Sequence, residues 1–313
     1  MRGIYFGSDE FSQNILERII KRNILKIVRV VSTPDKPQKR GLKILSTPVK
    51  KAAQNCGIEV FTPFSLDEKI YTELKKENPD LIIVVGYGKI LPSYFLTLPR
   101  IISIGIHPSL LPYYRGAAPI QRVLLEGERY TGVSIFKLDE KIDCGPLIVQ
   151  KKIAIEREDD YFSLFSKLVN LAIEGLEEAI HLIKEDKLLF FPQKGKVSYA
   201  PKIKKEEAKI DWNLSAEKIY NLIRALKKWP GGYTFYKGRR IKIIEAEIIS
   251  QESKGVPSQI VNWEKEGIDV ATGRGILRIR KIQPEGKRVM EAFEFVCGYR
   301  VKKGDSFSWG RQI

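Results

Sequence analysis

His107 is one of only two histidines in this 313-residue chain, and its surroundings are typical of a catalytic histidine. It follows an apolar run, residues 101–106, that is typical of a buried strand, so it should lie at the carboxyl end of that strand. Pro108 biases the backbone of His107 towards an extended conformation and thus directs its side chain. Histidine suits general acid–base chemistry near neutral pH. The other histidine, His181, falls near the end of a predicted helix, where a structural or solvent-facing role is expected.

A catalytic histidine needs a carboxylate that orients its ring and stabilises its cation. Asp143 is the best candidate, because it lies in a loop between two predicted strands, with Gly145 as a hinge. Asp139 and Glu140 compete in principle, but they adjoin a strand end and are interpreted as solvated charges. We therefore expect Asp143 to lie against His107.

The elements that must position this pair alternate between strand and helix. Strands are predicted at residues 3–7, 24–31, 58–61, 81–85 and 101–106, followed by an added pair at 131–139 and 146–155. Helices are predicted from about residue 8, at 48–56, at 65–77 with Ser65 as N-cap, and at 161–185. Such alternation builds a parallel sheet covered by helices on both faces. The chain is thus expected to open with an α/β domain over residues 1–190.

The composition changes over residues 191–207, which show no sustained apolar period and are interpreted as a linker. Beyond this stretch, one helix is predicted at 215–227. Five short strands follow between residues 232 and 282, separated by glycine-containing and charged turns. This pattern indicates a small β-barrel as a second domain, over residues 208–313.

Two common nucleotide-binding motifs are missing. The turn after the first strand, 7-GSDEFS-12, lacks the G-x-G-x-x-G pattern, and no G-x-x-x-x-G-K-[ST] loop occurs, so dinucleotide and triphosphate binding are not expected. Gly86-Tyr87-Gly88 follows the most apolar strand, at the edge where an open α/β sheet places its ligand crevice. A plain turn explains this G-x-G equally well.

The cysteines and the apolar runs exclude several further kinds of site and segment. Cys56, Cys144 and Cys297 lie far apart, with no C-x-x-C pair, so structural thiols are expected rather than disulfides or a metal site. No apolar run approaches the ~18 residues of a membrane span. The chain begins without the apolar region of a signal peptide. We expect a cytoplasmic, metal-free protein, with a monomer as the default.

The charge balance favours a polyanionic partner. The chain carries 54 Lys and Arg against 38 Asp and Glu, a net charge of +16. Residues 205–313 hold 22 basic and 14 acidic side chains, so the basic excess is densest in the predicted barrel. Neutralising phosphates releases counterions, which favours nucleic acid as the partner. A membrane surface is the weaker alternative, since no strongly basic amphipathic helix stands out.

Three motifs around the predicted site resemble those of methionyl-tRNA formyltransferases. They are H-P-S-L-L-P-x-x-R-G-A-A-P-I-Q-R over residues 107–122, T-G-V-S-I over 131–135 and D-x-G-P-L over 143–147. The likeness continues through residues 33–41, 198–212 and 270–290, so it covers nearly the whole chain in order.

This resemblance implies a fold and a reaction. The family has an α/β fold, with a Rossmann-like formyltransferase domain followed by a small OB-like barrel that helps to hold tRNA. It transfers the formyl group of 10-formyltetrahydrofolate to the α-amine of methionine on initiator tRNA, without a metal.

The resemblance also implies roles for individual residues. His107 and Asp143 match the last two members of the family's catalytic set, Asn-x-His plus Asp. The folate-binding loop is matched by Ser109, Leu110, Leu111 and Pro112. The segment lining the pterin pocket is matched by Gly86, Tyr87 and Gly88. The insertion used against the tRNA acceptor stem is matched by the loop that carries Lys36, Lys39, Arg40 and Lys43.

Gly105 departs from the family pattern, because it stands where the family has the catalytic asparagine. An amide donor there stabilises the oxyanion of the attacked carbonyl, and losing such a donor typically costs about 10²–10³ in rate. Three explanations are open: a backbone N–H or water replaces the amide, the chain is an active-site variant, or it binds without catalysis. Two other functions also stay open, a folate-dependent formyltransferase acting on an amino sugar nucleotide and a non-catalytic tRNA-binding relative.

Overall fold

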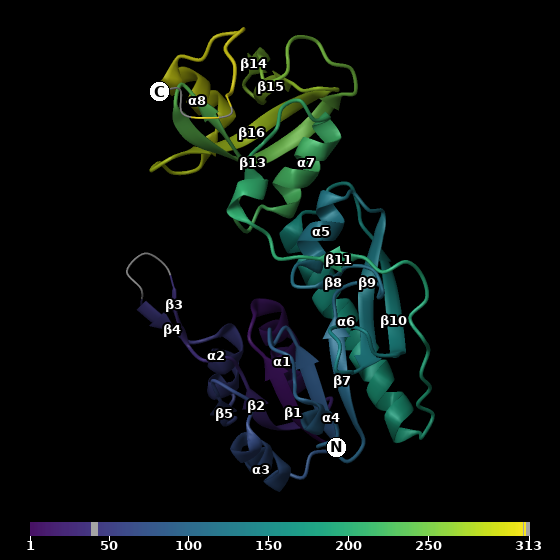
Figure 1. The fold of residues 1–313 in the computed structure, drawn as a ribbon. Helices are drawn as coiled ribbons and strands as arrows, with labels where there is room; N and C mark the ends of the chain where they lie inside the picture. The colour runs from purple at the N-terminus through teal and green to yellow at the C-terminus, as the bar shows by residue number, and fades with distance from the viewer. Residues whose placement is uncertain (39–42, 309, 311–313) are drawn as a thin grey trace. The chain divides into compact units, whose positions relative to one another are not determined.

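The computed structural model describes residues 1–38, 43–308 and 310, which form two compact units (Figure 1). The first unit comprises residues 1–119, 130–154 and 165–201. The second comprises residues 120–129, 155–164 and 202–313. Two short segments that interrupt the first unit, residues 120–129 and 155–164, therefore group with the second unit. The domain limits expected from the sequence, 1–190 and 208–313 with a linker at 191–207, stay a prediction.

A seven-stranded sheet forms the centre of the first unit, in the order β10-β9-β7-β6-β1-β2-β5. Its parallel strands are β1 (Arg2–Gly7), β2 (Lys26–Val31), β5 (Val60–Phe61), β6 (Leu81–Val85) and β7 (Ile102–His107). The antiparallel pair β9 (Tyr130–Lys137) and β10 (Leu147–Ala154) extends it beyond β7. This confirms the predicted Rossmann-like, parallel-rich sheet. The strand order reverses between β1 and β6, which is where such folds bind ligands at the carboxyl ends of the strands.

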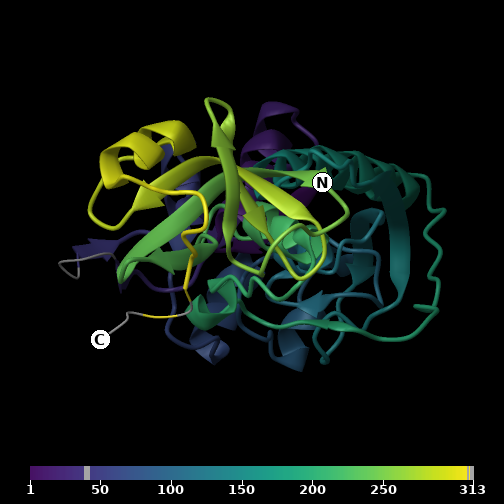
Figure 2. The ribbon, with the colours of Figure 1, turned by 90° about the horizontal axis from the view of Figure 1, so that it is seen from above.

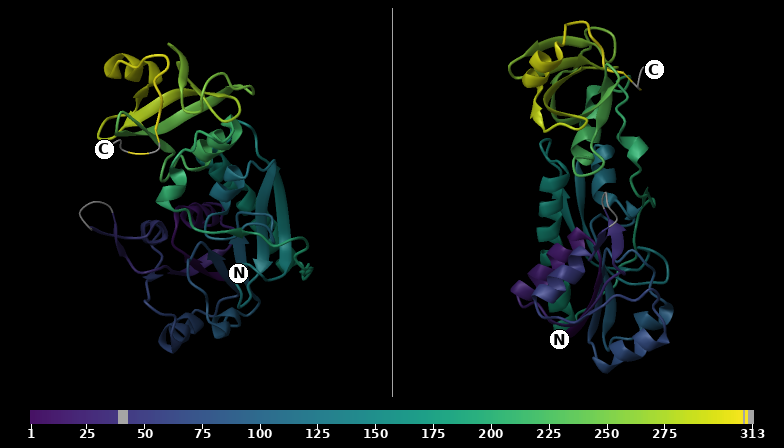
Figure 3. Two further views of the ribbon diagram at one scale, coloured as in Figure 1. Left: turned by 45° about the horizontal axis from the view of Figure 1, so that its top comes forward. Right: turned by 90° about the vertical axis from the view of Figure 1, so that its left-hand side faces the viewer.

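Helices cover both faces of this sheet, as the right-hand view of Figure 3 shows. One face carries α1 (Glu10–Lys21), α2 (Pro48–Asn55) and α6 (Tyr161–Lys184). The rings of Phe11 in α1 and Phe165 in α6 meet edge to face, with centroids 5.6 Å apart. The other face carries α3 (Glu68–Lys76) and α4 (Ser93–Leu96), whose Leu74 and Phe95 are buried in the same core as Phe6 of β1. Period-3.6 apolar faces on the helices and continuous apolar strands account for this layering.

The start of α3 differs from the prediction. Asp67, not Ser65, caps the helix, because its side chain accepts a hydrogen bond from the backbone N–H of Ile70 (3.0 Å). Asp is as good an N-cap as Ser, and Glu68 then lies in the first turn, where the helix dipole favours an acid. Two further short pairings complete the described part of this unit, β3 (Lys36–Gln38) with β4 (Lys43–Leu45), and β8 (Arg115–Gly116) with β11 (Tyr199–Ala200).

The second unit is built on an antiparallel sheet in the order β12-β13-β16-β15-β14, with β17 paired to β16. Its strands are β12 (Tyr233–Tyr236), β13 (Arg239–Ser250), β14 (Ile260–Glu264), β15 (Gly267–Ala271), β16 (Ile276–Pro284) and β17 (Met290–Glu291). The strands, green to yellow in Figure 2, curve and cross one another. Ser308 bridges to Phe235 of β12 and Ser306 bridges to Gln259 beside β14, so the C-terminal segment closes the sheet. The predicted small barrel is confirmed.

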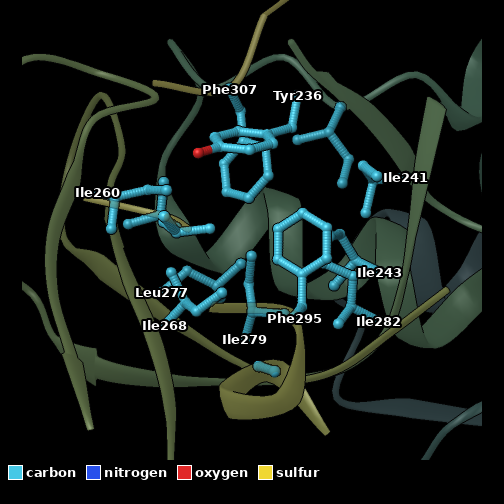
Figure 4. Close-up of a cluster of buried hydrophobic side chains, with 14 of the residues drawn as sticks. Tyr236, Ile241, Ile243, Ile260, Ile268, Leu277, Ile279, Ile282, Phe295 and Phe307 are labelled. Carbon is cyan, nitrogen blue, oxygen red and sulfur yellow. The ribbon is translucent and has the colours of Figure 1, made fainter. Parts of the chain in front are cut away.

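A core of isoleucines and aromatic rings fills this barrel (Figure 4). Two helices contribute to it, α7 (Ala216–Ala225), whose N-cap is Ser215, and α8 (Ala292–Tyr299). Phe295 of α8 is fully buried against Tyr236 of β12, with ring centroids 5.5 Å apart. The sequence did not predict α8.

Candidate active site

His107 is the last residue of β7, and all six residues of this strand are buried. Its Nε2 lies 2.8 Å from the carbonyl oxygen of Tyr114. A carbonyl can only accept, so Nε2 must carry the proton and donate it to Tyr114. The other ring nitrogen, Nδ1, is therefore the one that can take up or release a proton.

Asp143 faces that nitrogen. Its Oδ2 lies 3.7 Å from Nδ1 of His107, and only 8% and 16% of the two side chains are exposed. The same Oδ2 accepts a hydrogen bond from the backbone N–H of Gly116 (2.9 Å). The expected pairing of His107 with Asp143 is thus present in the structure. Asp139 and Glu140, the competing acids, are exposed.

Strained backbone supports this arrangement. Tyr114 and Asp143 are both in the left-handed region, with φ of 59° and 53°. Residues with a Cβ rarely adopt this conformation, and such strain is often found at functional sites. Lys137, the last residue of β9, pairs with Ile104 of β7. The loop of residues 138–146 starts there and must fold back to bring Asp143 to His107. Both turns serve to aim a group at the imidazole.

The loop matched to the folate-binding segment is held by buried hydrogen bonds. Ser134 Oγ accepts from the N–H of Leu111 (3.0 Å) and donates to the carbonyl of Ser109 (2.7 Å). Gln150 Nε2 donates to the carbonyl of Leu111 (3.0 Å). Leu111 and Pro112 are buried, and Leu110 is partly exposed. The loop is therefore firmly placed beside His107, while its role in folate binding stays a prediction.

The segment Gly86-Tyr87-Gly88 lies at the carboxyl end of β6, at the strand-order reversal. Gly86 and Gly88 have φ of 51° and 77°, which glycine adopts without strain. The side chain of Tyr87 packs in the core against Phe6, and burial raises its pKa to about 12. Its hydroxyl has no hydrogen-bond partner within the described parts of the chain. At Tyr87, only the backbone is left to line a ligand site.

Gly105 lies directly opposite Phe136 in the antiparallel pairing of β7 with β9. A Cβ at position 105 would lie 2.4 Å from the ζ carbon of the Phe136 ring and 3.1 Å from a δ carbon of Leu138. Phe136 is only 3% exposed. The ring thus occupies the space that a side chain at position 105 would need. The sequence alone did not reveal this neighbour, because it depends on strand register.

The predicted tRNA-binding residues are only partly placed. Lys36 lies in β3 and Lys43 in β4, which pair with each other. Lys39 and Arg40 lie outside the described residues.

Gln193 is a site residue that the sequence analysis missed. Its Nε2 donates to the carbonyls of Asp143 (2.9 Å) and Gly145 (2.8 Å), and its Oε1 accepts from Nη2 of Arg115 (2.6 Å). It lies in the stretch interpreted as a linker. That stretch is no free connection, because β11 pairs with β8 beside Tyr114. No signal in the sequence pointed to it, since it lies outside the segments that carry the resemblance.

The described residues contain neither a metal-ligating cluster nor a membrane-spanning helix. Over residues 1–38, 43–308 and 310, no group of three His, Cys, Asp or Glu side chains could hold a metal ion. No helix in the same ranges is long and apolar enough to cross a membrane.

Two family models match the chain, the formyl transferase model over residues 1–180 and the formyl transferase C-terminal domain model over residues 202–300. The chain belongs to the formyl transferase family. It is thus a formyl-transferring enzyme, and the formyl donor of this family is 10-formyltetrahydrofolate.

Relatives named methionyl-tRNA formyltransferase are similar over nearly their whole length. That of Dictyoglomus thermophilum is 44% identical over 316 residues, which are 98% of this chain and 100% of the relative. Those of Thermodesulfovibrio yellowstonii and Thermus thermophilus are 43% and 40% identical, each over 97% of this chain and 98% of the relative.

Solved structures share the fold at lower identity. HypX from Aquifex aeolicus in complex with tetrahydrofolic acid is 17% identical, with a TM-score of 0.64 over 99% of this chain and 51% of that chain. The N-formyltransferase from Helicobacter canadensis, in complex with folinic acid and dTDP-3-aminofucose, is 21% identical, with a TM-score of 0.63 over 89% of this chain and 98% of that chain.

Proposed function

We propose that this chain transfers the formyl group of 10-formyltetrahydrofolate to the α-amine of methionyl initiator tRNA. The observation that carries the proposal is the pairing of His107 with Asp143, 3.7 Å apart, at the end of β7. Relatives at 40–44% identity over nearly the whole chain bear the name of this activity, which supports the choice of acceptor.

In this reaction, the methionyl amine attacks the formyl carbon and a new C–N bond forms. The bond between the formyl carbon and N10 of the folate breaks, and the proton lost by the amine ends on N10. Because Nε2 of His107 is committed to Tyr114, proton transfer runs through Nδ1, which faces Asp143. The carboxylate of Asp143 lies beside Nδ1 and is proposed to orient the imidazole for this transfer.

The donor is expected to lie at the carboxyl edge of the sheet, near the reversal between β1 and β6. The turn at residues 86–88 and the rigid loop from Ser109 to Pro112 both adjoin this edge. Tyr87 takes part through its backbone alone, since its side chain is in the core. The formyl group would then reach His107 from the side of Asp143.

The acceptor is proposed from charge as well as from the relatives. The net charge of +16, and the surplus of basic residues in the second unit, suit a polyanion. Lys36, Lys39, Arg40 and Lys43 are proposed to contact the acceptor stem. We place the reaction in the cytoplasm and assign the protein as a monomer.

Gly105 is proposed to affect the rate of formyl transfer and not the type of reaction. No side-chain amide is available at this position, and Phe136 fills the space. Oxyanion stabilisation is therefore proposed to be impaired or rerouted.

An experiment with alternative acceptors tests this proposal. The protein and 10-formyltetrahydrofolate are mixed with methionyl initiator tRNA or with an amino sugar nucleotide, and the formylated product is measured in a single turnover. We expect formylated tRNA, a loss of about 10³-fold or more in His107→Ala, and no change in His181→Ala, the matched control. Formylation of the sugar nucleotide alone would favour the second acceptor class. Binding of tRNA without any transfer would favour a non-catalytic relative.

A further inference from the structure

We propose that Gln193 is a positioning residue, which holds Asp143 in the orientation that faces His107. The inference rests on the proposed function, since it assigns a role within the same site. Gln193 does not touch either reacting side chain; it contacts the backbone of the loop that carries Asp143.

The amide of Gln193 is fully used and its orientation is fixed. Both of its acceptors, the carbonyls of Asp143 and Gly145, can only accept, so the NH₂ group must face them. Its donor, the guanidinium of Arg115, can only donate, so the oxygen must face Arg115. A glutamate of the same shape could not donate to the two carbonyls, and an alanine would remove all three hydrogen bonds.

Asp143 needs such support for two reasons. Its backbone is in the left-handed region at φ 53°, which is unfavourable for a residue with a Cβ. Its Oδ2 must also satisfy the N–H of Gly116 while it faces Nδ1 of His107. The carbonyl of Asp143 belongs to the same residue, so fixing that carbonyl limits rotation of the whole turn.

Gln193 is one of several contacts between residues 191–200, here called the strap, and the loops of the site. Phe191 exchanges backbone hydrogen bonds with Leu147 (2.7 and 2.9 Å). Ser198 Oγ accepts from the N–H of Tyr114 (2.9 Å), the residue whose carbonyl holds His107. The strap thus connects the loop of Asp143 with the loop that fixes the imidazole. Among the described side chains of the strap, only that of Gln193 forms hydrogen bonds with the Asp143 turn.

A double-mutant cycle tests whether Gln193 acts through Asp143. In single turnover with saturating substrates, Gln193→Ala is expected to slow transfer by about 10- to 100-fold, because a misplacement near 1 Å costs about that much. In the Asp143→Asn background, the same change should alter the rate less than threefold. The apparent Kd for tRNA should stay within twofold. Gln54→Ala, at an exposed position of α2, is the matched control and should leave the rate unchanged.

A second measurement does not need activity. The chain has only two histidines, so ¹⁵N-histidine labelling gives two imidazole spin systems. We expect the Nδ1 signal of His107 to move in Asp143→Asn and in the same direction in Gln193→Ala, while the signals of His181 stay in place. Gln193→Glu should resemble Gln193→Ala, because the carboxylate cannot donate.

The outcomes separate the two proposals. An equal rate loss for Gln193→Ala in both backgrounds, or an unmoved His107 signal in a folded Gln193→Ala protein, would overturn the positioning role. Absence of formyl transfer by the unmodified chain would instead count against the proposed function, and the NMR result would still decide on Gln193.

Discussion

An asparagine at position 105 should raise the formylation rate strongly only when Phe136 is shortened, and not when the Phe136 ring is present. The Cβ of residue 105 would lie 2.4 Å from the tip of the Phe136 ring, against a normal contact of about 3.5–4.0 Å. The overlap exceeds an ångström, and both residues lie in buried strands. Overpacking of this kind typically costs about 1–3 kcal/mol. Gly105→Asn should thus be destabilised by about that amount.

The rate depends on where the amide comes to lie. An oxyanion donor is worth about 10²–10³ in rate, but only when it is held at the correct position. In Gly105→Asn the ring and the amide compete for one space, so we expect a gain below tenfold. Phe136→Leu removes the ring tip and keeps the site apolar. In that background, Gly105→Asn should raise the single-turnover rate by at least tenfold over Phe136→Leu alone.

The formylation rate in a single turnover and the free energy of unfolding in urea are measured for the unmodified chain, Gly105→Asn, Phe136→Leu and the double variant. Two results would exclude this effect of Phe136. A gain of 10² or more in Gly105→Asn, with no loss of stability, would show that Phe136 is no obstacle. No gain in the double variant, with a folded protein, would show that position 105 is not an oxyanion position.

Three further predictions concern other parts of the molecule. Tyr87→Phe should raise the free energy of unfolding by about 1 kcal/mol, because it removes a buried hydroxyl without a partner in the described chain; lost stability together with weaker folate binding would contradict the core placement. The hydrogen bond from Arg122 lowers the pKa of Glu207 in the folded protein. This pair therefore stabilises the second unit fully at pH values above the unfolded pKa of Glu, about 4.3. The stabilisation is lost as the pH falls through the lower pKa of the folded state. Glu207→Gln should therefore lower the free energy of unfolding by about 1 kcal/mol or less at pH 7 and leave it unchanged in strong acid. Unfolding can be followed by tryptophan fluorescence, since all four tryptophans lie in this unit. An equal loss of stability at every pH would exclude the charge as its cause. Lys36→Glu and Lys43→Glu should each weaken tRNA binding and reduce the slope of log K against log salt by about one, whereas an unchanged slope would exclude phosphate contacts.

Patterns local in sequence predicted most of the fold. Continuous apolar strands alternating with amphipathic helices indicated the parallel sheet, and short strands between turns indicated the barrel. The segment that forms α8 was missed because its aromatic and β-branched residues and Gly298 do not favour a helix. Burial of Phe295 and Val296 against the barrel stabilises that helix instead.

Features that depend on strand register or on a returning segment could not be predicted in the same way. The chemistry of histidine and its need for a carboxylate led to Asp143 from the sequence. Phe136 became visible as the neighbour of Gly105 only through the pairing of β7 with β9. Gln193 was missed because its partners are backbone carbonyls fifty and forty-eight positions earlier, which no side-chain pattern reveals.

We propose that His107 and Asp143 act as one unit, and a cycle of His107→Ala, Asp143→Asn and the double variant in single-turnover formylation measures their coupling. Residues that act together are strongly non-additive, so the double variant should be within about threefold of the slower single variant. Rate losses that multiply in the double variant would show instead that the imidazole and the carboxylate work independently.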